Sequence, residues 1–158
     1  PQPATPTFNR FVNRDLSGSA DKTVPAGTIE ECESICGSDG SCAAYTYNRW
    51  ARLCFIKSSV GDLATNARVT SGVKSTYGTP PASTSAVSFE HFRGRGFMTD
   101  PARQTFAPSG DGCENACSTW GGCIAYTFRL GQNRCDRDYV TEEYFPQAGS
   151  TSGAKRQD

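Results

Sequence analysis

The sequence predicts an α+β fold in which two small disulfide-bonded modules follow one another along the chain. The first observation is that four cysteines, separated by gaps of three, five and eleven residues, occur twice, 81 positions apart. The second is that each set of four begins in a segment of helical periodicity and continues into segments that alternate as strands do. The third is the length of 158 residues, which suits two small domains as well as one of medium size.

The repetition extends beyond the cysteines. An ungapped comparison of residues 8–74 with residues 89–155 gives 18 identical positions out of 67. Residues 75–88, between the copies, are rich in Ser, Thr and Pro, and residues 1–7 have the same character. Such composition is typical of linkers. We therefore predict two modules, over residues 8–74 and 89–155, joined by a linker at 75–88 and preceded by an N-terminal extension at 1–7.

A short helix is predicted at the start of each set of cysteines. In the first module Thr28 can cap the helix with its hydroxyl, and Glu31 three residues later completes a capping box. The second module lacks this box, because Ser109 is followed three residues later by a glycine. We expect Asp111 to be the cap there, with Glu114 three residues later, and we expect a shorter helix.

The segments after each helix predict a small antiparallel sheet on which the helix packs. In the first module residues 42–47 are expected to form a strand, with Cys42 on one face and Tyr45 on the other. Residues 48–53 are expected to be a hairpin-like connection to a second strand, "LCFIKS", and residues 68–74 a third strand. The second module is expected to follow the same order.

The positions of the cysteines favour one pairing out of the three that four cysteines allow. Cys32 and Cys36 lie one helical turn apart on the same face, so each is expected to bond outward to the sheet. Cys36 is close in sequence to Cys42, which leaves Cys32 for Cys54. The same reasoning predicts the disulfides Cys117–Cys123 and Cys113–Cys135 in the second module.

A zinc site is the alternative for each set of four cysteines. Structural zinc sites usually place paired ligands two to four residues apart in two groups, whereas eleven residues separate Cys42 from Cys54. The spacing therefore favours disulfides, and we predict neither a metal nor a cofactor. An even number of regularly placed cysteines also favours an oxidising compartment, so the chain is expected to be secreted, periplasmic or at the cell surface.

The segment "TIEECESICGSDGSCAAYTYN", followed by "LCFIKS" and the terminal "SGVK", resembles the PAN/apple superfamily, and its short four-cysteine type in particular. The resemblance covers both copies, although "CDRD" replaces "CFIK" in the second, so that Asp138 stands at the position of Lys57. It implies a helix cradled by a curved antiparallel sheet, with the same disulfide pairings. It also implies a recognition module for proteins or carbohydrates. Modules of this type accompany macroglobulin-like protease traps and hydrolases in bacterial envelope proteins.

Charge and composition argue against nucleic-acid and membrane partners. The 16 basic and 16 acidic residues give a formal net charge of zero, unlike the basic surface of a nucleic-acid-binding protein. No apolar run approaches the roughly 18–20 residues of a membrane span. The single histidine, His91, lies beside Phe89 and Phe92 and is more typical of an edge strand than of a catalytic site. We predict no catalytic residues.

A binding surface is expected in the loops, where aromatic and cationic residues occur together. Trp50 lies in the hairpin connection, with Arg49 and Arg52 close to it. Aromatic and arginine side chains dominate protein interfaces, and aromatic rings offer stacking surfaces for sugars. The alternative is that each tryptophan covers the small core of its own module. The further candidates are Lys57, Trp120 after the second helix, and Arg129 and Arg134 in the equivalent loop of the second copy.

These features together predict a non-catalytic recognition module that binds a protein or glycan ligand outside the cytoplasm. Two linked weak sites gain avidity when the ligand is repetitive and the linker can span it. The chain is expected to continue covalently into flanking domains of a larger exported protein. The alternative is a structural accessory arm that positions a neighbouring domain, such as a macroglobulin-like protease trap or a hydrolase.

Overall fold

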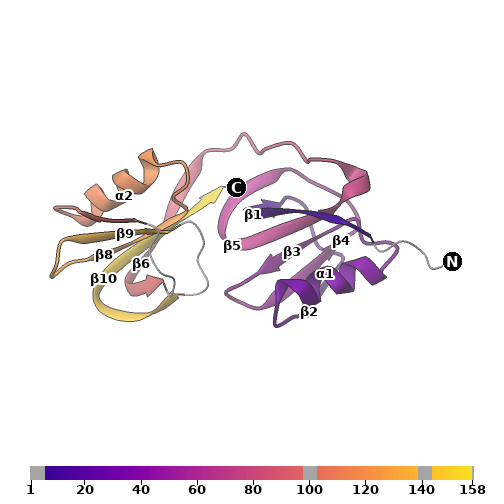
Figure 1. The fold of residues 1–158 in the computed structure, drawn as a ribbon, viewed down its shortest axis with the longest axis horizontal. Coiled ribbons are helices and arrows are strands. Elements are labelled where there is room, and N and C mark those ends of the chain that lie inside the picture. The colour runs from indigo at the N-terminus through magenta and orange to yellow at the C-terminus, as the bar shows by residue number, and fades with distance from the viewer. Residues whose placement is uncertain (1–5, 98–102, 139–143, 158) are drawn as a thin grey trace. The chain divides into compact units, whose positions relative to one another are not determined.

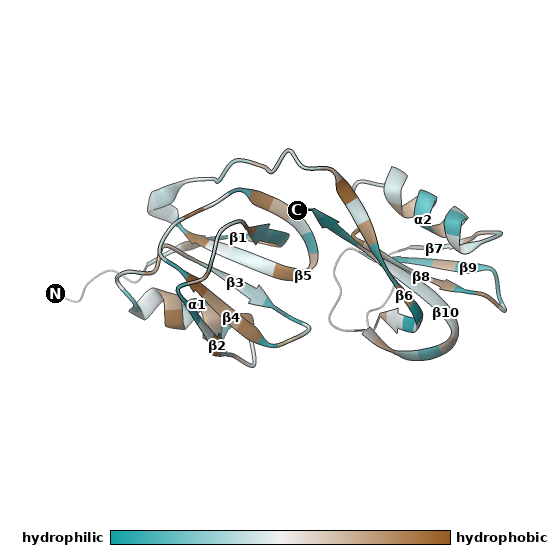
Figure 2. Cartoon of the chain, turned by 180° about the vertical axis from the view of Figure 1, so that it is seen from behind, coloured by the Kyte–Doolittle hydropathy of each residue, from teal (hydrophilic) through white to brown (hydrophobic). Residues whose placement is uncertain are grey.

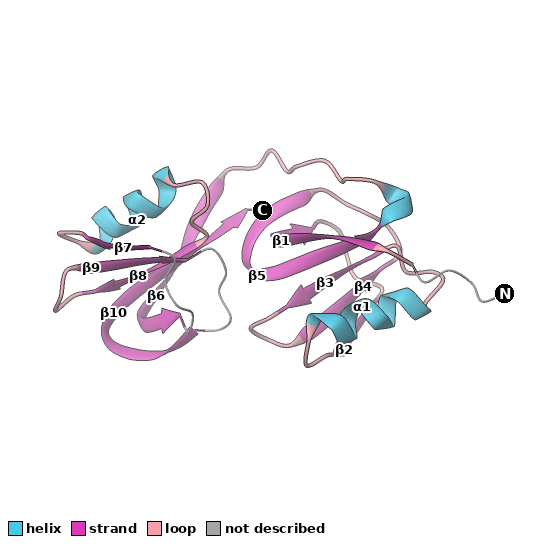
Figure 3. Cartoon of the chain, in the orientation of Figure 1, coloured by secondary structure: helices cyan, strands magenta, loops and turns pink. Residues whose placement is uncertain are grey.

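The computed structural model describes residues 6–97, 103–138 and 144–157, and the chain divides into two units (Figure 1). Unit 1 comprises Pro1–Thr65 and Val69–Ser85, and unit 2 comprises Asn66–Arg68 and Ala86–Asp158. Each unit contains one α-helix and one antiparallel sheet, drawn in cyan and magenta in Figure 3. The prediction of an α+β fold with two modules of the same kind is confirmed.

Unit 1 has a sheet in the order β2–β4–β3–β5–β1, in which all neighbouring strands are antiparallel. The helix α1 (Ile29–Ser38) packs against β3 and β4. The strands are β1 (Phe8–Leu16), β2 (Lys22–Pro25), β3 (Ala44–Asn48), β4 (Leu53–Lys57) and β5 (Leu63–Lys74), and a turn of 3-10 helix, η1 (Ser75–Tyr77), follows β5.

Unit 2 repeats this arrangement with the order β7–β9–β8–β10–β6. The helix α2 (Gly110–Thr119) packs against β8 and β9. The strands are β6 (Val87–Phe97), β7 (Arg103–Phe106), β8 (Ala125–Arg129), β9 (Arg134–Asp138) and β10 (Tyr144–Gln157). No helix within the described ranges is both long and apolar enough to cross a membrane.

The two helices begin in the same way. In α1 the backbone N–H of Glu31 donates to the hydroxyl oxygen of Thr28 (3.2 Å), and the Glu31 carboxylate accepts from the N–H of Gly27 (2.9 Å). In α2 the N–H of residue 112 donates to the hydroxyl of Ser109 (3.1 Å). The prediction that Asp111 caps a shorter α2 is wrong, since both helices have 10 residues. A hydroxyl cap needs only a backbone N–H three residues on, which glycine supplies.

Each helix covers a core built around its cysteines. Figure 2 shows β4 of unit 1 as a largely hydrophobic strand. Cys42, Tyr45 and Tyr47 all face this core, so the expectation that Cys42 and Tyr45 lie on opposite faces is wrong. Cys42 precedes the first residue of β3, so the strand's alternation does not reach it, and it turns toward Cys36 of α1. The two cores are Ala26, Cys32, Cys36, Cys42, Tyr45, Tyr47, Cys54 and Ile56 in unit 1, and Ala107, Cys113, Cys117, Cys123, Tyr126, Phe128 and Cys135 in unit 2.

The face of the unit 1 sheet that lies away from α1 is also buried in part. Ala44 of β3 packs there with Leu16, Leu63 and Val73. Burial of both faces explains why residues 44–47 are uniformly buried rather than alternating between buried and exposed.

Part of the segment predicted as a linker is hydrogen-bonded to unit 1. The N–H of Leu63 donates to the carbonyl oxygen of Pro81 (2.8 Å), and the N–H of Ser83 donates to the carbonyl oxygen of Leu63 (2.7 Å). Because Leu63 is the first residue of β5, these bonds hold residues 81–83 along the start of that strand.

Candidate binding surfaces

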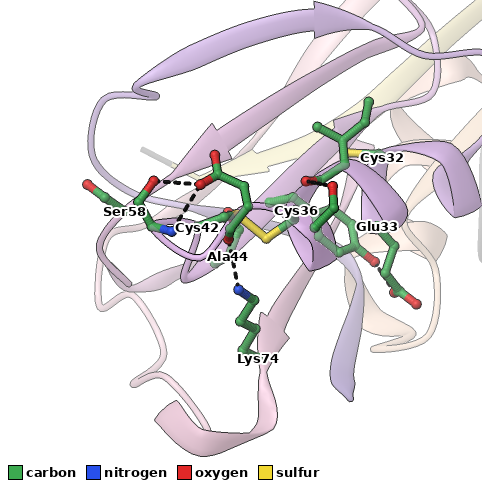
Figure 4. The surroundings of a disulfide bond; sticks show 12 residues. Cys32, Glu33, Cys36, Cys42, Ala44, Ser58 and Lys74 are labelled. Carbon is green, nitrogen blue, oxygen red and sulfur yellow. Dashed lines mark hydrogen bonds between the residues drawn. A yellow bond between two sulfur atoms is a disulfide. The ribbon is translucent and has the colours of Figure 1, made fainter. Parts of the chain in front are cut away.

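All eight cysteines are paired in disulfides, with the predicted connectivity. Figure 4 shows the bridge from Cys36 in α1 to Cys42 at the entrance to β3. The Cα–Cα distances of the four bridges lie between 5.2 and 5.3 Å, inside the usual range for a disulfide. A sulfur in a disulfide is neither a thiolate nucleophile nor a zinc ligand, so these residues act as covalent cross-links between helix and sheet.

A polar contact joins the first strand, the helix and the middle strand of unit 1. Glu33 on α1 accepts hydrogen bonds from Arg10 Nε on β1 (2.9 Å) and from the Tyr45 hydroxyl on β3 (2.5 Å). Burial raises the pKa of Tyr45, and the neighbouring Glu33 carboxylate adds to that shift. Burial also acts to raise the pKa of Glu33, but the hydrogen bonds from Arg10 and Tyr45 outweigh it and leave that pKa lowered. We call these three residues the clamp of unit 1.

Unit 2 contains the same clamp with one substitution. Glu114 on α2 accepts from the Tyr126 hydroxyl (3.2 Å), and His91 on β6 takes the place of the arginine and contacts the same carboxylate oxygen. In each unit a phenylalanine of the first strand meets the clamp tyrosine edge to face, with a centroid distance of 5.6 Å between Phe89 and Tyr126. The position of His91 in this clamp assigns it a structural role.

The repeated "SG" of the last strand is required by the clamp tyrosine. Tyr45 lies directly across from Gly72, and a Cβ built on that glycine would come within 2.3 Å of the tyrosine ring. In unit 2 a Cβ on Gly153 would come within 2.5 Å of Tyr126. Only glycine leaves room for the ring at these two positions, so the residues that repeat in the sequence are largely those that build the scaffold.

The predicted binding residues of unit 1 lie in and beside the turn between β3 and β4. The Arg49 guanidinium donates to Thr70 Oγ1 (2.6 Å) and Asn13 Oδ1 (2.9 Å), so it holds the turn to the neighbouring strands. Trp50 is partly buried, and Arg52 is exposed with a left-handed backbone (φ 55°). Of these candidates, Arg52 is the most accessible to a ligand.

Lys57, the remaining candidate in unit 1, is 5% exposed. Its ammonium donates to the carbonyl oxygens of Leu16 and Gly18 (3.3 Å to Gly18). Burial lowers the pKa of Lys57, and the charge of Asp15 offsets only part of that shift. The side chain therefore holds the chain that follows β1 and does not reach the surface of unit 1.

The predicted residues of unit 2 fall on opposite faces of its sheet. Trp120, directly after α2, packs against the helix-side core, and the Arg137 guanidinium lies 5.3 Å from its ring centroid. Arg129 and Arg134 lie on the other face, where both approach Asp136. The structure therefore brings Arg129 and Arg134 together and separates both from Trp120.

Comparison with known families identifies the repeated scaffold. Two profiles described as PAN domain match the chain, one over residues 7–80 and one over residues 100–141. The chain belongs to the PAN domain family. The solution structure of the two N-terminal apple domains of Toxoplasma gondii microneme protein 4 is similar over 92% of this chain and 86% of that one, with 18% sequence identity and a TM-score of 0.33. A comparison with curated proteins gives no match.

The second PAN domain carries two exposed apolar residues that the sequence analysis did not single out. Phe106 at the end of β7 is 77% exposed, and Leu130 in the turn between β8 and β9 is 59% exposed. Phe106 lies directly across from Arg134, and Arg134 lies directly across from Arg129. A comparison of the two copies could have identified Phe106 as a candidate, because Pro25 stands at the equivalent position in the first PAN domain.

Proposed function

We propose that this chain is a non-catalytic pair of recognition modules that binds a protein or a glycan outside the cytoplasm. PAN domains are typically protein- or carbohydrate-binding modules. The observation that supports the proposal here is the contrast between a repeated interior and a divergent exposed end. The disulfides, the clamp and the glycine under the clamp tyrosine recur in both domains. The side chains around the turn that follows the middle strand do not recur.

The divergence is greatest along one cross-strand row. In the first domain this row reads Pro25, Leu53, Asn48 and Val69 across four strands. In the second domain the equivalent row reads Phe106, Arg134, Arg129 and Ser150. Val69 and Ser150 are buried, so the exposed differences lie on the other three strands. A common scaffold with different side chains at this end suits two domains that contact different features of a ligand, and linkage of two weak sites raises the overall affinity.

The setting of this function is extracellular. Four disulfides and two PAN domains point to an oxidising environment. Within that setting we infer a secreted, periplasmic or surface location, with flanking domains that hold the pair near its ligand.

The test is a binding screen of the oxidised chain. The chain is immobilised through one terminus and exposed to a glycan array, and in parallel to extracytoplasmic proteins with cross-linking and mass spectrometry. The control is the same chain after reduction and alkylation, which removes all four cross-links. Binding that depends on intact disulfides supports recognition. Absence of binding in both screens would refute the proposal and favour the alternative of a structural arm for a neighbouring domain.

A further inference from the structure

We propose that the exposed face of the unit 2 sheet at Phe106, Arg134 and Arg129 binds an acidic segment of a protein partner, with a carboxylate at the arginines and an apolar side chain against Phe106. This inference rests on the proposed recognition function and names the site and the chemistry of its ligand. We call Phe106, Arg134 and Arg129 the arginine row.

The strand register places the arginine row on one face. Directly opposite residues in antiparallel strands point to the same side of the sheet. Phe106 of β7 is opposite Arg134 of β9, and Arg134 is opposite Arg129 of β8. The next residue of β9, Cys135, points to α2 through its bridge to Cys113. The arginine row therefore faces away from the helix.

The charged side chains that a ligand can reach in the row are both arginines, each about a third exposed. Arg134 donates twice to the Asp136 carboxylate, from Nε (2.9 Å) and from its terminal nitrogen (3.2 Å), and these bonds raise the pKa of Arg134. Arg129 shares the same carboxylate at 3.5 Å. Asp136 is itself buried, with 7% of its side chain exposed. Asp138, two residues further along β9 and 3% exposed, places a second buried carboxylate on this face. The partly exposed guanidinium groups are therefore the charges of the row that a ligand meets.

Arg129 has hydrogen-bonding capacity to spare. Its Nε is buried and lies 3.5 Å from Asp136 Oδ2 without forming a hydrogen bond among the described residues. About a third of the side chain, 34%, remains exposed. A guanidinium carries five N–H donors in a planar fork that matches a carboxylate. A ligand carboxylate would therefore accept from the terminal nitrogens of Arg129, because the buried Nε is out of its reach.

The exposed apolar residues beside the row favour a protein over a glycan. Phe106 and Leu130 are among the most exposed large hydrophobic residues of the described chain. Aromatic residues and arginine together are enriched at the centres of protein interfaces. An aliphatic Leu130 offers no flat surface for stacking on a sugar ring. A short acidic peptide with an apolar side chain next to its carboxylates matches both the charge and the apolar surface.

The row belongs to the second domain alone. The equivalent residues of the first domain are Pro25, Leu53 and Asn48, and Asn48 Oδ1 accepts from the N–H groups of Trp50 and Ala51 within its own turn (3.0 Å each). The equivalent row of the first domain therefore contains no arginine.

The experiment measures binding of a fluorescein-labelled synthetic peptide of Glu-Glu-Leu repeats to the full oxidised chain by fluorescence anisotropy. A peptide of Gln-Gln-Leu repeats is the control for charge. The protein variants are Arg134→Gln, Arg129→Gln and Phe106→Ser. The matched control variant is Arg93→Gln, which removes the same charge from an exposed position of β6 on the helix side of the sheet.

We expect the glutamate peptide to bind and the glutamine peptide to bind far more weakly. Each variant of the arginine row should raise the Kd at least about tenfold, as for residues central to an interface, whereas Arg93→Gln should leave it unchanged. The side-chain Nε–H resonances of Arg129 and Arg134 should shift on titration with the peptide. Non-reducing mass spectrometry confirms that each variant retains four disulfides.

Four results would overturn the inference. Equal weakening by Arg93→Gln would show non-specific attraction of charge, and unchanged affinity in the row variants would place the site elsewhere. Binding of polygalacturonate at the row without binding of the peptide would make the ligand an acidic glycan. If the glutamate peptide does not bind at all, the acidic-peptide assignment fails, while the recognition function is decided separately by the screen of unselected ligands.

Discussion

Removal of the Cys32–Cys54 disulfide is expected to destabilise unit 1 more than removal of Cys36–Cys42. The perturbation is replacement of both cysteines of one pair by alanine. The two bridges close segments of very different length, with sequence separations of 22 and 6 residues. All four cysteines are at most 1% exposed, so the loss of buried sulfur is similar in the two variants and largely cancels from their comparison.

The magnitude follows from the loop that each bridge closes in the unfolded chain. Loop-closure entropy gives about 3.4 kcal/mol for a separation of 22 residues and about 2.2 kcal/mol for 6 residues at 25 °C. The longer bridge should therefore contribute about 1 kcal/mol more to the free energy of unfolding. The same difference is expected between Cys113–Cys135 and Cys117–Cys123, whose separations are also 22 and 6.

The two tryptophans make the measurement specific to one unit. Trp50 lies in unit 1 and Trp120 in unit 2. A Trp120→Phe background leaves Trp50 fluorescence as the reporter of unit 1 during urea unfolding, and the free energies of the two double-alanine variants are then compared. Equal losses, or a larger loss for Cys36–Cys42, would refute loop closure as the source of the difference.

Two further predictions concern the clamp and the strand beneath it. Gly72→Ala should reduce the free energy of unfolding by about 1–3 kcal/mol, because its Cβ would meet the Tyr45 ring at 2.3 Å. Gly40→Ala, where no atom lies within 4 Å of the added Cβ, is the control, and an equal loss there would contradict the steric explanation. Glu33→Gln should reduce the loss of stability that occurs as the pH falls into the acidic range. The measurement is the urea midpoint of unfolding across a pH series. The lowered folded-state pKa of Glu33 stabilises the fold above its unfolded value of about 4.3, and this contribution is lost as pH falls through the folded-state pKa. A wild-type midpoint that falls no faster than that of Glu33→Gln would disprove the stabilising role of the hydrogen bond from Arg10.

The helix and disulfide predictions show which structural features can be predicted from residues that are close in the sequence. Cys32 and Cys36 were paired correctly because one helical turn places both on a single face. The sequence pattern indicates Asp111 as the cap of α2, and this prediction is wrong, because the absence of a capping box does not prevent Ser109 from capping the helix. The serine hydroxyl accepts from a backbone N–H of the first helical turn. A motif defined by side chains does not reveal this hydrogen bond.

The binding residues show the limit of the same reasoning. Composition singled out Arg129, Arg134 and Trp120, but it did not show that Trp120 lies on the other face of the sheet from the two arginines. Lys57 is a candidate binding residue in the sequence, but the fold buries it against backbone carbonyls. The face of the sheet to which a side chain points depends on where its strand begins. A shift of one residue in register moves the side chain to the opposite face.

By itself, the sequence determined that the chain repeats one disulfide-bonded α+β module. The spacing of cysteines, caps and alternating residues is local, and local spacing specifies helices, strands and short cross-links. Only the tertiary structure decided that Phe106, Arg134 and Arg129 form one row. Phe106 is more than twenty positions from both arginines in the chain, and the antiparallel register of β7, β9 and β8 brings them together. Long-range pairing of this kind is set by burial of the whole sheet and not by the residues of any one strand.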